Sequence, residues 1–273
     1  MRLGGSVMKP YSSPKEWLEQ VKELNYSAVV FPVDSSAPKA VRQDYLQCCR
    51  DNDLLIGEVG VWRNCLDRAE GEKHTEYAIR QLELAEEVGA NCCVNIAGSW
   101  GSVWDGYHAD QGTKVFYDAV VENTRRIIDA VKPQKTCFSL EPMPWMTPES
   151  PEEYLRLIGD VDREGFRVHL DFANMINGLD RYRASDAFIR RCFELLGPYI
   201  RSIHAKDLLI DDQILPICIK EVPPGEGSID LKLALQLAMA LPGDIPVFVE
   251  HLDSHEAYLK ASAYMHALLK TIA

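Results

Sequence analysis

The chain has 273 residues, of which 47% are hydrophobic and 26% are charged, and its formal net charge is −12. A chain of this length and composition can bury one large core. The negative charge repels phosphate backbones, so we expect no nucleic-acid partner. No apolar stretch approaches the roughly 20 residues that a membrane span needs, so we expect no membrane partner either.

Eight cysteines are present, and they include the adjacent pairs Cys48/Cys49 and Cys92/Cys93. Several lie inside apolar runs and no CxxC occurs, which is typical of cysteines that act as small buried hydrophobic residues. We also recognise no signal peptide at the start of the sequence. The cysteines therefore predict reduced thiols in a cytoplasmic protein.

Short β-like runs alternate with longer segments that have helical spacing of apolar residues. Parallel strands need crossover connections, and helices between successive strands supply them. The pattern predicts a (β/α)8 TIM barrel over residues 1–273, because such barrels take about 250 residues. A doubly wound open sheet is the alternative, but no GxGxxG follows a strand. The expected strands are Leu3–Met8, Ala28–Val33, Leu54–Trp62, Cys92–Ala97, Cys137–Glu141, Arg167–Asp171, Ile200–His204 and Pro246–Glu250.

Capping residues mark several of the expected helices. Ser13 is suited to cap a helix that starts at Pro14, and Gly89 is suited to end one. Ser228 is expected to cap the helix before the last strand. The helical segments are 13–25, 74–90, 115–133, 150–161, 185–199, 228–241 and 254–273.

Four polar residues stand at the carboxyl ends of the last four expected strands. They are Glu141, Asp171, His204 and Glu250. Active sites of parallel barrels lie at this face. Taken singly, each residue is more simply a solvated loop residue or a core histidine. As a set, three carboxylates and one imidazole suit one divalent ion, with Mn²⁺ expected first and Mg²⁺, Co²⁺ or Zn²⁺ as alternatives.

Lys206 is expected to face the same site. Side chains two residues apart on a strand share a face, so Lys206 follows His204 toward the barrel axis. It could offset the negative charge of the carboxylates or bind an anionic group of the substrate. By the same alternation, His251 is expected to point away from the site because Glu250 points inward.

These residues occur in segments that resemble the xylose isomerase-like TIM barrels, the sugar phosphate isomerase/epimerase family that includes endonuclease IV relatives. The resemblance is most specific in "SLEPMPW", "VHLDFANMIN", "GPYIRSIHAKD", "VPPGEGSID" and "VFVEHL". It implies that Glu141, Asp171, His204 and Glu250 are metal ligands and that the two glutamates also form the acid/base pair. It further implies that Lys206 holds substrate and that the protein forms a homo-oligomer.

The activity implied by the resemblance is isomerisation or epimerisation of a keto-sugar, inosose or keto-acid through a metal-stabilised enediolate. The same enediolate could expel a leaving group, so a dehydratase, decarboxylase or C-glycoside-cleaving lyase is the alternative. An endonuclease IV-like activity is disfavoured by the net charge of −12, by only seven histidines and by the absence of an HxH pair. A non-catalytic sugar-binding barrel would have a broken ligand set, and this set is intact.

Three positions depart from the pattern typical of ketose 3-epimerases in the family. Asn174 stands where those proteins carry a histidine after the strand-six aspartate. Ile210 replaces an arginine, and Thr147 replaces a second glutamate. These departures weaken the specific expectation of a free-ketose 3-epimerase.

Further substrate contacts are expected from Asn174, Glu58, Trp145 and His108. Glu58 lies in the third expected strand, near its carboxyl end, and could equally be a solvated loop residue. Trp145 could stack on a sugar face, and His108 lies in the long aromatic loop 98–108, which is of a kind that often covers barrel sites. His169, one pleat below the strand-six aspartate, is expected to make hydrogen bonds in the core.

Overall fold

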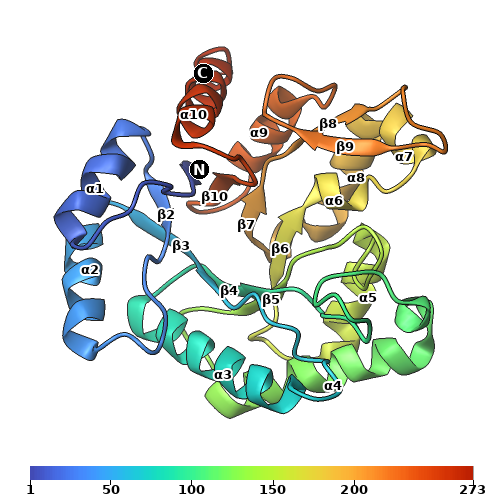
Figure 1. The fold of residues 1–273 in the computed structure, drawn as a ribbon, viewed down its shortest axis with the longest axis horizontal. Coiled ribbons are helices and arrows are strands. Elements are labelled where there is room, and N and C mark those ends of the chain that lie inside the picture. Colours follow the sequence, from blue (N-terminus) through green and yellow to red (C-terminus); the bar gives the residue numbers. More distant parts are fainter. Residues whose placement is uncertain (273) are drawn as a thin grey trace.

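The structure, a computed structural model, describes residues 1–272. Eight parallel strands in this range form two four-stranded sheets, with orders β1-β10-β7-β6 and β2-β3-β4-β5 (Figure 1). All eight were expected from the sequence; the bounds of Ile200–His204 agree, and those of the others differ by up to three residues at one or both ends. They are β1 (Arg2–Gly5), β2 (Ala28–Val30), β3 (Leu55–Gly60), β4 (Cys92–Asn95), β5 (Phe138–Leu140), β6 (Val168–Asp171), β7 (Ile200–His204) and β10 (Pro246–Val249).

Backbone hydrogen bonds join the two sheets at both seams. Ser27 N donates to Leu3 O at 2.9 Å, which connects β2 to β1. Phe138 N donates to Gly165 O at 2.8 Å, and Arg167 N donates to Phe138 O at 3.0 Å, which connects β5 to β6. The eight strands therefore form a ring, as the predicted TIM barrel requires.

Helices cover the outside of the ring, and their order along the chain gives the β/α alternation (Figure 1). Parallel strands are buried on both faces, so each crossover helix packs its apolar stripe against the sheet. The long helices are α1 (Pro14–Glu23), α2 (Lys39–Asp51), α3 (Gly71–Val88), α4 (Lys114–Val131), α5 (Pro151–Val161), α8 (Ser185–Leu196), α9 (Leu231–Met239) and α10 (His255–Lys270). Of the predicted last helix, residue 273 lies outside the described residues.

Two of the capping predictions are confirmed and one is wrong. Ser13 Oγ accepts from Glu16 N at the start of α1, and Gly89 ends α3 with φ of 71°. Ser228 does not cap α9, because the helix begins three residues later. Asp230 is the cap, and its Oδ1 accepts from Leu233 N at 2.9 Å.

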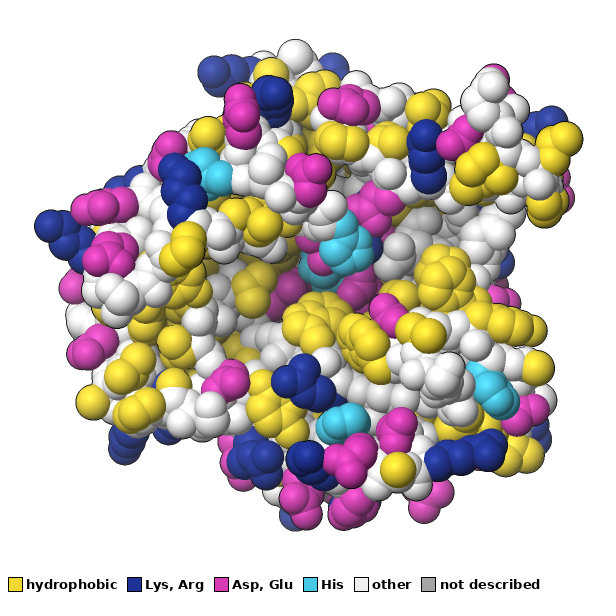
Figure 2. All heavy atoms as spheres, in the orientation of Figure 1, with side chains coloured by type: hydrophobic (Ala, Val, Ile, Leu, Met, Phe, Trp, Pro, Cys, Tyr) yellow, Lys and Arg dark blue, Asp and Glu magenta, His cyan; other side chains and the backbone are white. Residues whose placement is uncertain are grey.

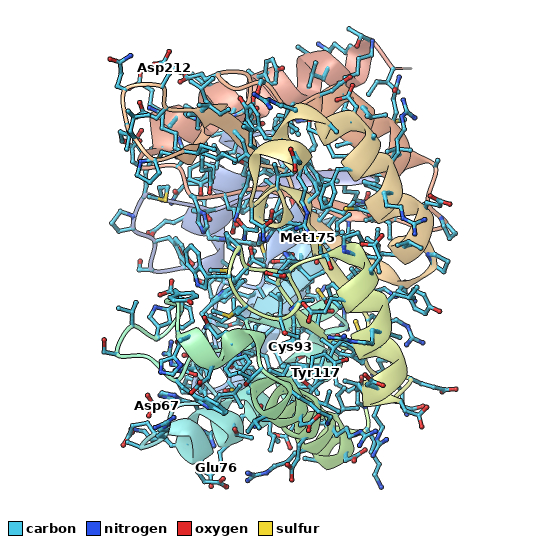
Figure 3. The ribbon with its side chains drawn as sticks, turned by 90° about the vertical axis from the view of Figure 1, so that its right-hand side faces the viewer. Asp67, Glu76, Cys93, Tyr117, Met175 and Asp212 are labelled. Atoms are coloured by element: carbon cyan, nitrogen blue, oxygen red, sulfur yellow. The ribbon has the colours of Figure 1, made fainter. Side chains whose placement is uncertain are left out.

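Sequence reasoning did not identify α2 or the segments that follow β6 and β7. The buried face of α2 consists only of Tyr45, Leu46 and Cys49, so its apolar periodicity is weak. Two short helices, α6 (Phe172–Met175) and α7 (Leu179–Arg183), follow β6. An antiparallel hairpin of β8 (Asp207–Ile210) and β9 (Ile219–Val222) follows β7, and Asp212 lies in its turn (Figure 3).

The core lies inside the ring and between the ring and the helices. Cys93, which Figure 3 labels in the interior, is fully buried. All eight cysteines are free in the described residues and six of them are buried, as the sequence predicts. None of the described helices combines the length and the apolar character that crossing a membrane requires.

Tyr154 of α5 reinforces the seam between β5 and β6 with its fully buried hydroxyl. The hydroxyl donates to Leu140 O at 2.7 Å. It also accepts from Leu140 N at 3.2 Å and from His169 N at 3.3 Å. A single side chain thus satisfies backbone groups on the two strands that carry Glu141 and Asp171.

We predict that Tyr154→Phe lowers the free energy of unfolding by about 1–3 kcal/mol, because buried backbone groups lose a partner. Urea unfolding measures this change. The matched control is Tyr117→Phe, whose half-exposed hydroxyl donates to Asp160 at 2.7 Å, and we expect it to cost less than about 0.5 kcal/mol. Equal losses in the two variants would contradict the role given to Tyr154.

Candidate metal centre and active-site cavity

The four strand-end residues converge on one point. Glu141, Asp171, His204 and Glu250 each offer one ligand atom, and these atoms all lie within 4.8 Å of one another. His204 Nδ1 is 2.8 Å from Glu250 Oε1 and 3.2 Å from Glu141 Oε1. The strands are parallel, so their carboxyl ends meet at one face of the barrel. The cluster that the sequence predicts is therefore present as a geometric arrangement.

Lys206 points into the same cluster, as the side-chain alternation predicts. Its Nζ lies 2.6 Å from Glu250 Oε1, 2.7 Å from Asp171 Oδ2 and 3.4 Å from Glu141 Oε1. Burial favours the neutral amine, but the three carboxylates outweigh burial and raise the pKa of Lys206 well above its usual value. The side chain is 1% exposed, so its charge serves the carboxylates rather than the open cavity.

The carboxylates of the cluster differ in proton affinity. Burial raises the pKa of Asp171 to about 6. The neighbouring glutamates add to this effect, and Lys206 opposes it. Burial also acts against ionisation of Glu250, yet His204 and Lys206 hold the pKa of Glu250 well below its usual range. Glu250 is therefore an ionised carboxylate at neutral pH, and Asp171 takes up a proton first on acidification.

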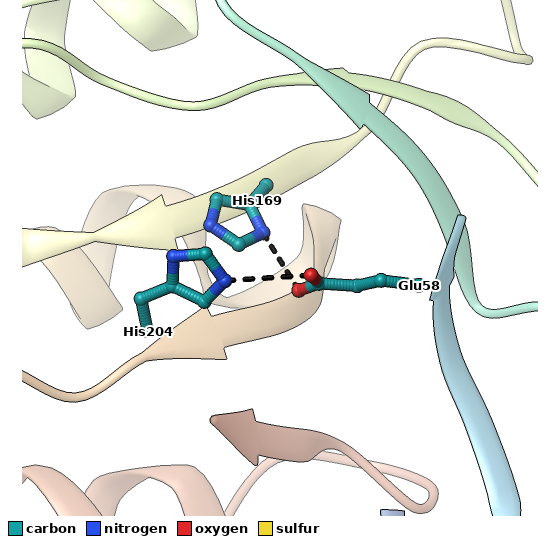
Figure 4. Close-up of side chains that lie close together, drawn as sticks. All are labelled: Glu58, His169 and His204. Carbon is teal, nitrogen blue, oxygen red and sulfur yellow. Dashed lines mark hydrogen bonds and ion pairs between the residues drawn. The ribbon is translucent and has the colours of Figure 1, made fainter. Parts of the chain in front are cut away.

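Glu58 lies beneath His204, where it contacts two imidazoles (Figure 4). Its Oε2 is 3.4 Å from His204 Nε2, and its Oε1 is 3.1 Å from His169 Nδ1. Burial raises the pKa of Glu58, but the two imidazoles lower it more, to about 2. Glu58 is 1% exposed and is not a solvated loop residue. His169 is fully buried and also lies 2.6 Å from Ser202 Oγ, in agreement with the predicted core hydrogen bonding.

Two observations test whether this cluster suits a divalent cation. Asp171 Oδ2 and Glu250 Oε1 are buried and have no hydrogen-bond partner among the described residues. The Lys206 ammonium is close to both oxygens but not in hydrogen-bonding geometry, so it balances charge without satisfying the two acceptors. Buried carboxylate oxygens without donors are what a metal ion coordinates.

Charge gives the second test. Three buried carboxylates and the partly buried carboxylate of Glu250 surround one buried ammonium and one imidazole. The pKa of that imidazole is raised well above its usual value, mainly by Glu250 against the effect of burial. Even with that imidazole protonated, two negative charges remain in excess, which a divalent cation would neutralise. The donor set, three carboxylates and one imidazole, fits Mn²⁺, Mg²⁺, Co²⁺ or Zn²⁺.

A cavity of about 650 Å³ opens above the cluster at the carboxyl face of the barrel. Figure 2 shows the acidic and histidine side chains in the hollow, with hydrophobic side chains around it. Asp171 and Lys206 lie beneath the cavity wall. The sequence-predicted residues that line it are Glu58, Glu141, Trp145, Asn174, His204 and Glu250.

Asn174 fixes the orientation of two members of the cluster. Its backbone N donates to Asp171 Oδ1 at 2.9 Å, and its Nδ2 donates to Glu141 Oε1 at 3.3 Å. Its Oδ1 accepts from Lys206 Nζ at 3.4 Å. Asn174 therefore holds the carboxylates in place and lines the cavity; its contact with substrate stays a prediction.

The expectations for His108 and His251 need correction. His108 does not line the cavity; its Nδ1 accepts from Asp110 N at the start of the short 3-10 helix Ala109–Gly112. His251 does line the cavity, although it was expected to point away. The strand ends at Val249, and His251 has φ of 56°, so side-chain alternation no longer applies there.

The positions that depart from the ketose 3-epimerase pattern divide into two kinds. Asn174 lines the cavity, whereas Thr147 is buried away from it and its Oγ1 donates to Glu153 at 3.2 Å. Ile210 lies at the end of β8 and is also outside the cavity wall. Five aromatic residues that line the cavity were not identified from the sequence: Tyr11, Trp17, Phe31, Trp62 and Phe248. They come from α1, from β10 and from segments after three different strands, and a single aromatic residue in such a segment carries no local signal.

We predict that Glu58→Gln weakens divalent-cation binding by about 10- to 100-fold, because the group that orients the imidazole of His204, an expected ligand, loses its charge. Titration calorimetry with Mn²⁺ measures the affinity, and thermal unfolding of the cation-free protein checks that the fold is kept. Glu226→Gln, in an exposed loop, is the control and should bind normally. An unchanged affinity in Glu58→Gln would contradict this role.

We also predict that the affinity for Mn²⁺ decreases as the pH is lowered, with one dependence near pH 7 and a steeper one below about pH 6. Near pH 7, binding displaces about one proton, from His204, whose pKa is raised. Below about pH 6, Asp171 is protonated as well, and the slope of log affinity against pH steepens to about two. Competition titrations from pH 5 to 8 measure the slope. A slope that stays at one down to pH 5 would show that Asp171 is already ionised in the metal-free protein and would contradict its raised pKa.

Comparison with known proteins agrees with this arrangement. Residues 18–268 match the family model of the xylose isomerase-like TIM barrel. Comparison with curated protein sequences gives no match.

Solved structures of the same fold cover nearly the whole chain. A xylose isomerase-like TIM barrel protein from Mycobacterium smegmatis, in complex with magnesium, has 19% identity and a TM-score of 0.69 over 94% of this chain and 89% of that one. The probable 3-DHS dehydratase AsbF of Bacillus anthracis has 18% identity and a TM-score of 0.71, covering 95% and 94%. The 3-keto-D-glucoside 4-epimerase YcjR of E. coli has 16% identity and a TM-score of 0.69, covering 98% and 99%. At these identities the likeness concerns the fold, and the family match over residues 18–268 shows that the chain belongs to the xylose isomerase-like TIM barrel family.

Proposed function

We propose that this protein is a divalent-metal-dependent isomerase or epimerase of a keto-sugar, an inosose or a related keto-acid, with Mn²⁺ as the expected ion. The observation that carries the proposal is the pair Glu141 and Glu250. They come from strands separated by β6 and β7, yet both contact one imidazole, at 3.2 and 2.8 Å. Two carboxylates thus approach the floor of one cavity from two sides. The relatives named as an epimerase and a dehydratase are consistent with this class of reaction.

The metal ligands in this proposal are Glu141, Asp171, His204 and Glu250. A divalent ion bound there would stabilise negative charge on a substrate carbonyl oxygen and so make the neighbouring C–H bond more acidic. The protein contributes the proton transfers. Glu250 and Glu141 both have lowered pKa values despite burial, because His204 and Lys206 offset the effect of burial and, for Glu141, the repulsion from Glu250. Either carboxylate is therefore ready to accept a proton.

The fate of the proton decides the product. Return of the proton to the adjacent carbon gives an aldose–ketose isomerisation, and delivery to the opposite face of the same carbon gives an epimer. Glu250 is the better placed to exchange its proton with water in the cavity, since its side chain is 14% exposed and that of Glu141 is 5% exposed. Asn174 holds Glu141 in position for the transfer.

A lyase reaction is the second candidate, because the cavity volume of about 650 Å³ leaves room beside the reacting atoms for a leaving group. If a leaving group stands β to the substrate carbonyl, the enediolate left after removal of the C–H proton would expel it. Incubation of the Mn²⁺-loaded protein with keto-sugars in D₂O, followed by NMR, separates the two reactions. Isomerisation gives deuterium at carbon without loss of a fragment, and elimination releases water or another fragment.

We predict that Glu141→Gln and Glu250→Gln each lower kcat by about 10²- to 10⁴-fold, since each removes a proton carrier. Metal analysis of each variant is needed because both residues are also expected ligands; the loss in kcat should persist at saturating Mn²⁺. Glu226→Gln is the control and should keep the normal kcat. If either active-site variant retained full activity when metal-loaded, the acid/base pair would be wrong.

A further inference from the structure

From the lining of the cavity we infer that the substrate is an uncharged sugar derivative with a bulky apolar or aryl substituent, such as an aryl glycoside, rather than a sugar phosphate or a sugar acid. The inference rests on the proposed function in one respect: it takes the carboxylate cluster as the place of the reacting sugar ring. It goes beyond that function by naming the chemical class of the substrate. Three features of the cavity carry it.

The first feature is the charge of the wall. Among the described residues that line the cavity, none is lysine or arginine, and the carboxylates are Glu58, Asp105, Glu141 and Glu250. The nearby ammonium of Lys206 is buried against the carboxylates and lies outside the wall. Two imidazoles, His204 and His251, also line the cavity, but each is already paired with a carboxylate, at 2.8 Å from Glu250 and 3.0 Å from Glu221. A phosphate or free carboxylate would therefore have to be desolvated among these negative charges without lysine, arginine or an unpaired imidazole as a partner in the described wall, which is costly. One bound divalent ion would not make the net charge of the cavity wall positive.

The second feature is an apolar wall formed by β2 and by the segments that follow β1, β2 and β3. Glu58 of β3 is the one carboxylate among the described lining residues on this side, and its two oxygens face the imidazoles of His204 and His169. The other residues that line this side are mainly aliphatic and aromatic. A neutral sugar ring needs polar partners, so a continuous apolar wall fits a part of the substrate other than the ring. Its residues are Val7, Tyr11, Val29, Phe31, Pro32 and Trp62.

Trp62 is held in this wall by an unusual backbone. Its φ is 50°, in the left-handed region that a bulky residue rarely adopts. Its indole lies directly over Gly60, where a Cβ would stand 2.2 Å from the indole Nε1. Positive φ at a large residue costs free energy and is found mainly at ligand sites. The absence of a side chain at Gly60 and the left-handed backbone of Trp62 therefore allow the indole to lie in the cavity lining.

The third feature is aromatic surface at the mouth. Trp104 and Trp145 line the cavity and are 42% and 41% exposed. Trp145 Nε1 donates to Asp105 O at 2.9 Å, which ties the loop after β5 to the loop after β4. Large exposed indoles beside a hollow mark a surface that binds apolar groups. Figure 2 shows hydrophobic side chains gathered at the rim of the hollow.

Size agrees with the same class of ligand. Cavities that enclose drug-sized molecules span about 300–1,000 Å³, and this one measures about 650 Å³. The polar floor accounts for a sugar ring, and the apolar wall and the indoles account for a substituent attached to it. A glycoside with an aryl group meets both requirements, whereas a free or phosphorylated monosaccharide leaves the apolar wall in contact with water.

The test compares three probes that share one sugar: phenyl β-D-glucoside, methyl β-D-glucoside and glucose 6-phosphate. Titration calorimetry with the Mn²⁺-loaded protein gives the affinities. We expect the phenyl glycoside to bind at least about tenfold more tightly than the methyl glycoside, from burial of the ring. We expect glucose 6-phosphate to bind more weakly than the methyl glycoside. Equal binding of the two glycosides, no binding of the phenyl glycoside, or tightest binding of the phosphate would overturn the inference.

Variants locate the preference in the wall. Trp62→Ala and Trp145→Ala should each reduce the phenyl-to-methyl affinity ratio toward one, with thermal unfolding as the check on folding. Tyr107→Ala removes an aromatic residue that is 70% exposed and outside the cavity wall, and it should keep the wild-type ratio. Loss of the ratio in Tyr107→Ala but not in the tryptophan variants would overturn the assignment.

The binding experiment is independent of catalysis. A phenyl preference without deuterium exchange on any keto-sugar or keto-glycoside would remove the proposed function and keep this inference. Deuterium exchange on such substrates without a preference for the phenyl glycoside would keep the proposed function and remove this inference.

Discussion

The site depends on the electrostatic balance among buried carboxylates at the carboxyl end of the barrel. Glu58, Glu141 and Asp171 are buried, Glu250 is partly buried, and Lys206 and His204 supply the positive charge that faces them. Buried like charges repel strongly in a medium of low polarity. The arrangement therefore persists only with cations among the carboxylates, and the two acceptor oxygens without donors indicate that the protein's own cations do not complete it.

The barrel makes this concentration of charge possible because rigid neighbouring residues hold the charged side chains in place against their mutual repulsion. Each charged side chain is at or next to the end of a parallel strand, and the core beneath is closely packed. Tyr154 ties together β5 and β6, while Asn174 links Asp171, Glu141 and Lys206 through hydrogen bonds. Preorganised polar groups of this kind can act on a substrate without a further cost of reorganisation. The opposite wall adds apolar surface, so one cavity joins a reactive floor to a binding wall.

The barrel, its eight strands and the residues of the cluster could be predicted from the sequence, because a β/α alternation brings the carboxyl ends of all strands, and the polar residues there, to one face of the barrel. Sequence reasoning could not settle Glu58, whose environment depends on His169 and His204 from strands distant in the sequence. His251 was misplaced because the strand ends at Val249, and alternation is valid only within a strand. Trp62 and the other wall aromatics come from separate loops, and only the fold brings them together. The resemblance to the family supplied the ligand roles, while the lining of the cavity came from the structure alone.

The most direct test of this account is anomalous diffraction from crystals of the protein grown with Mn²⁺. The account predicts one manganese peak per chain, within about 2.0–2.6 Å of ligand atoms from Glu141, Asp171, His204 and Glu250. It also predicts that the Lys206 ammonium gives way to the ion while it stays near Asn174. A cluster with no manganese peak at a saturating concentration, with Lys206 still lying among the carboxylates, would contradict it.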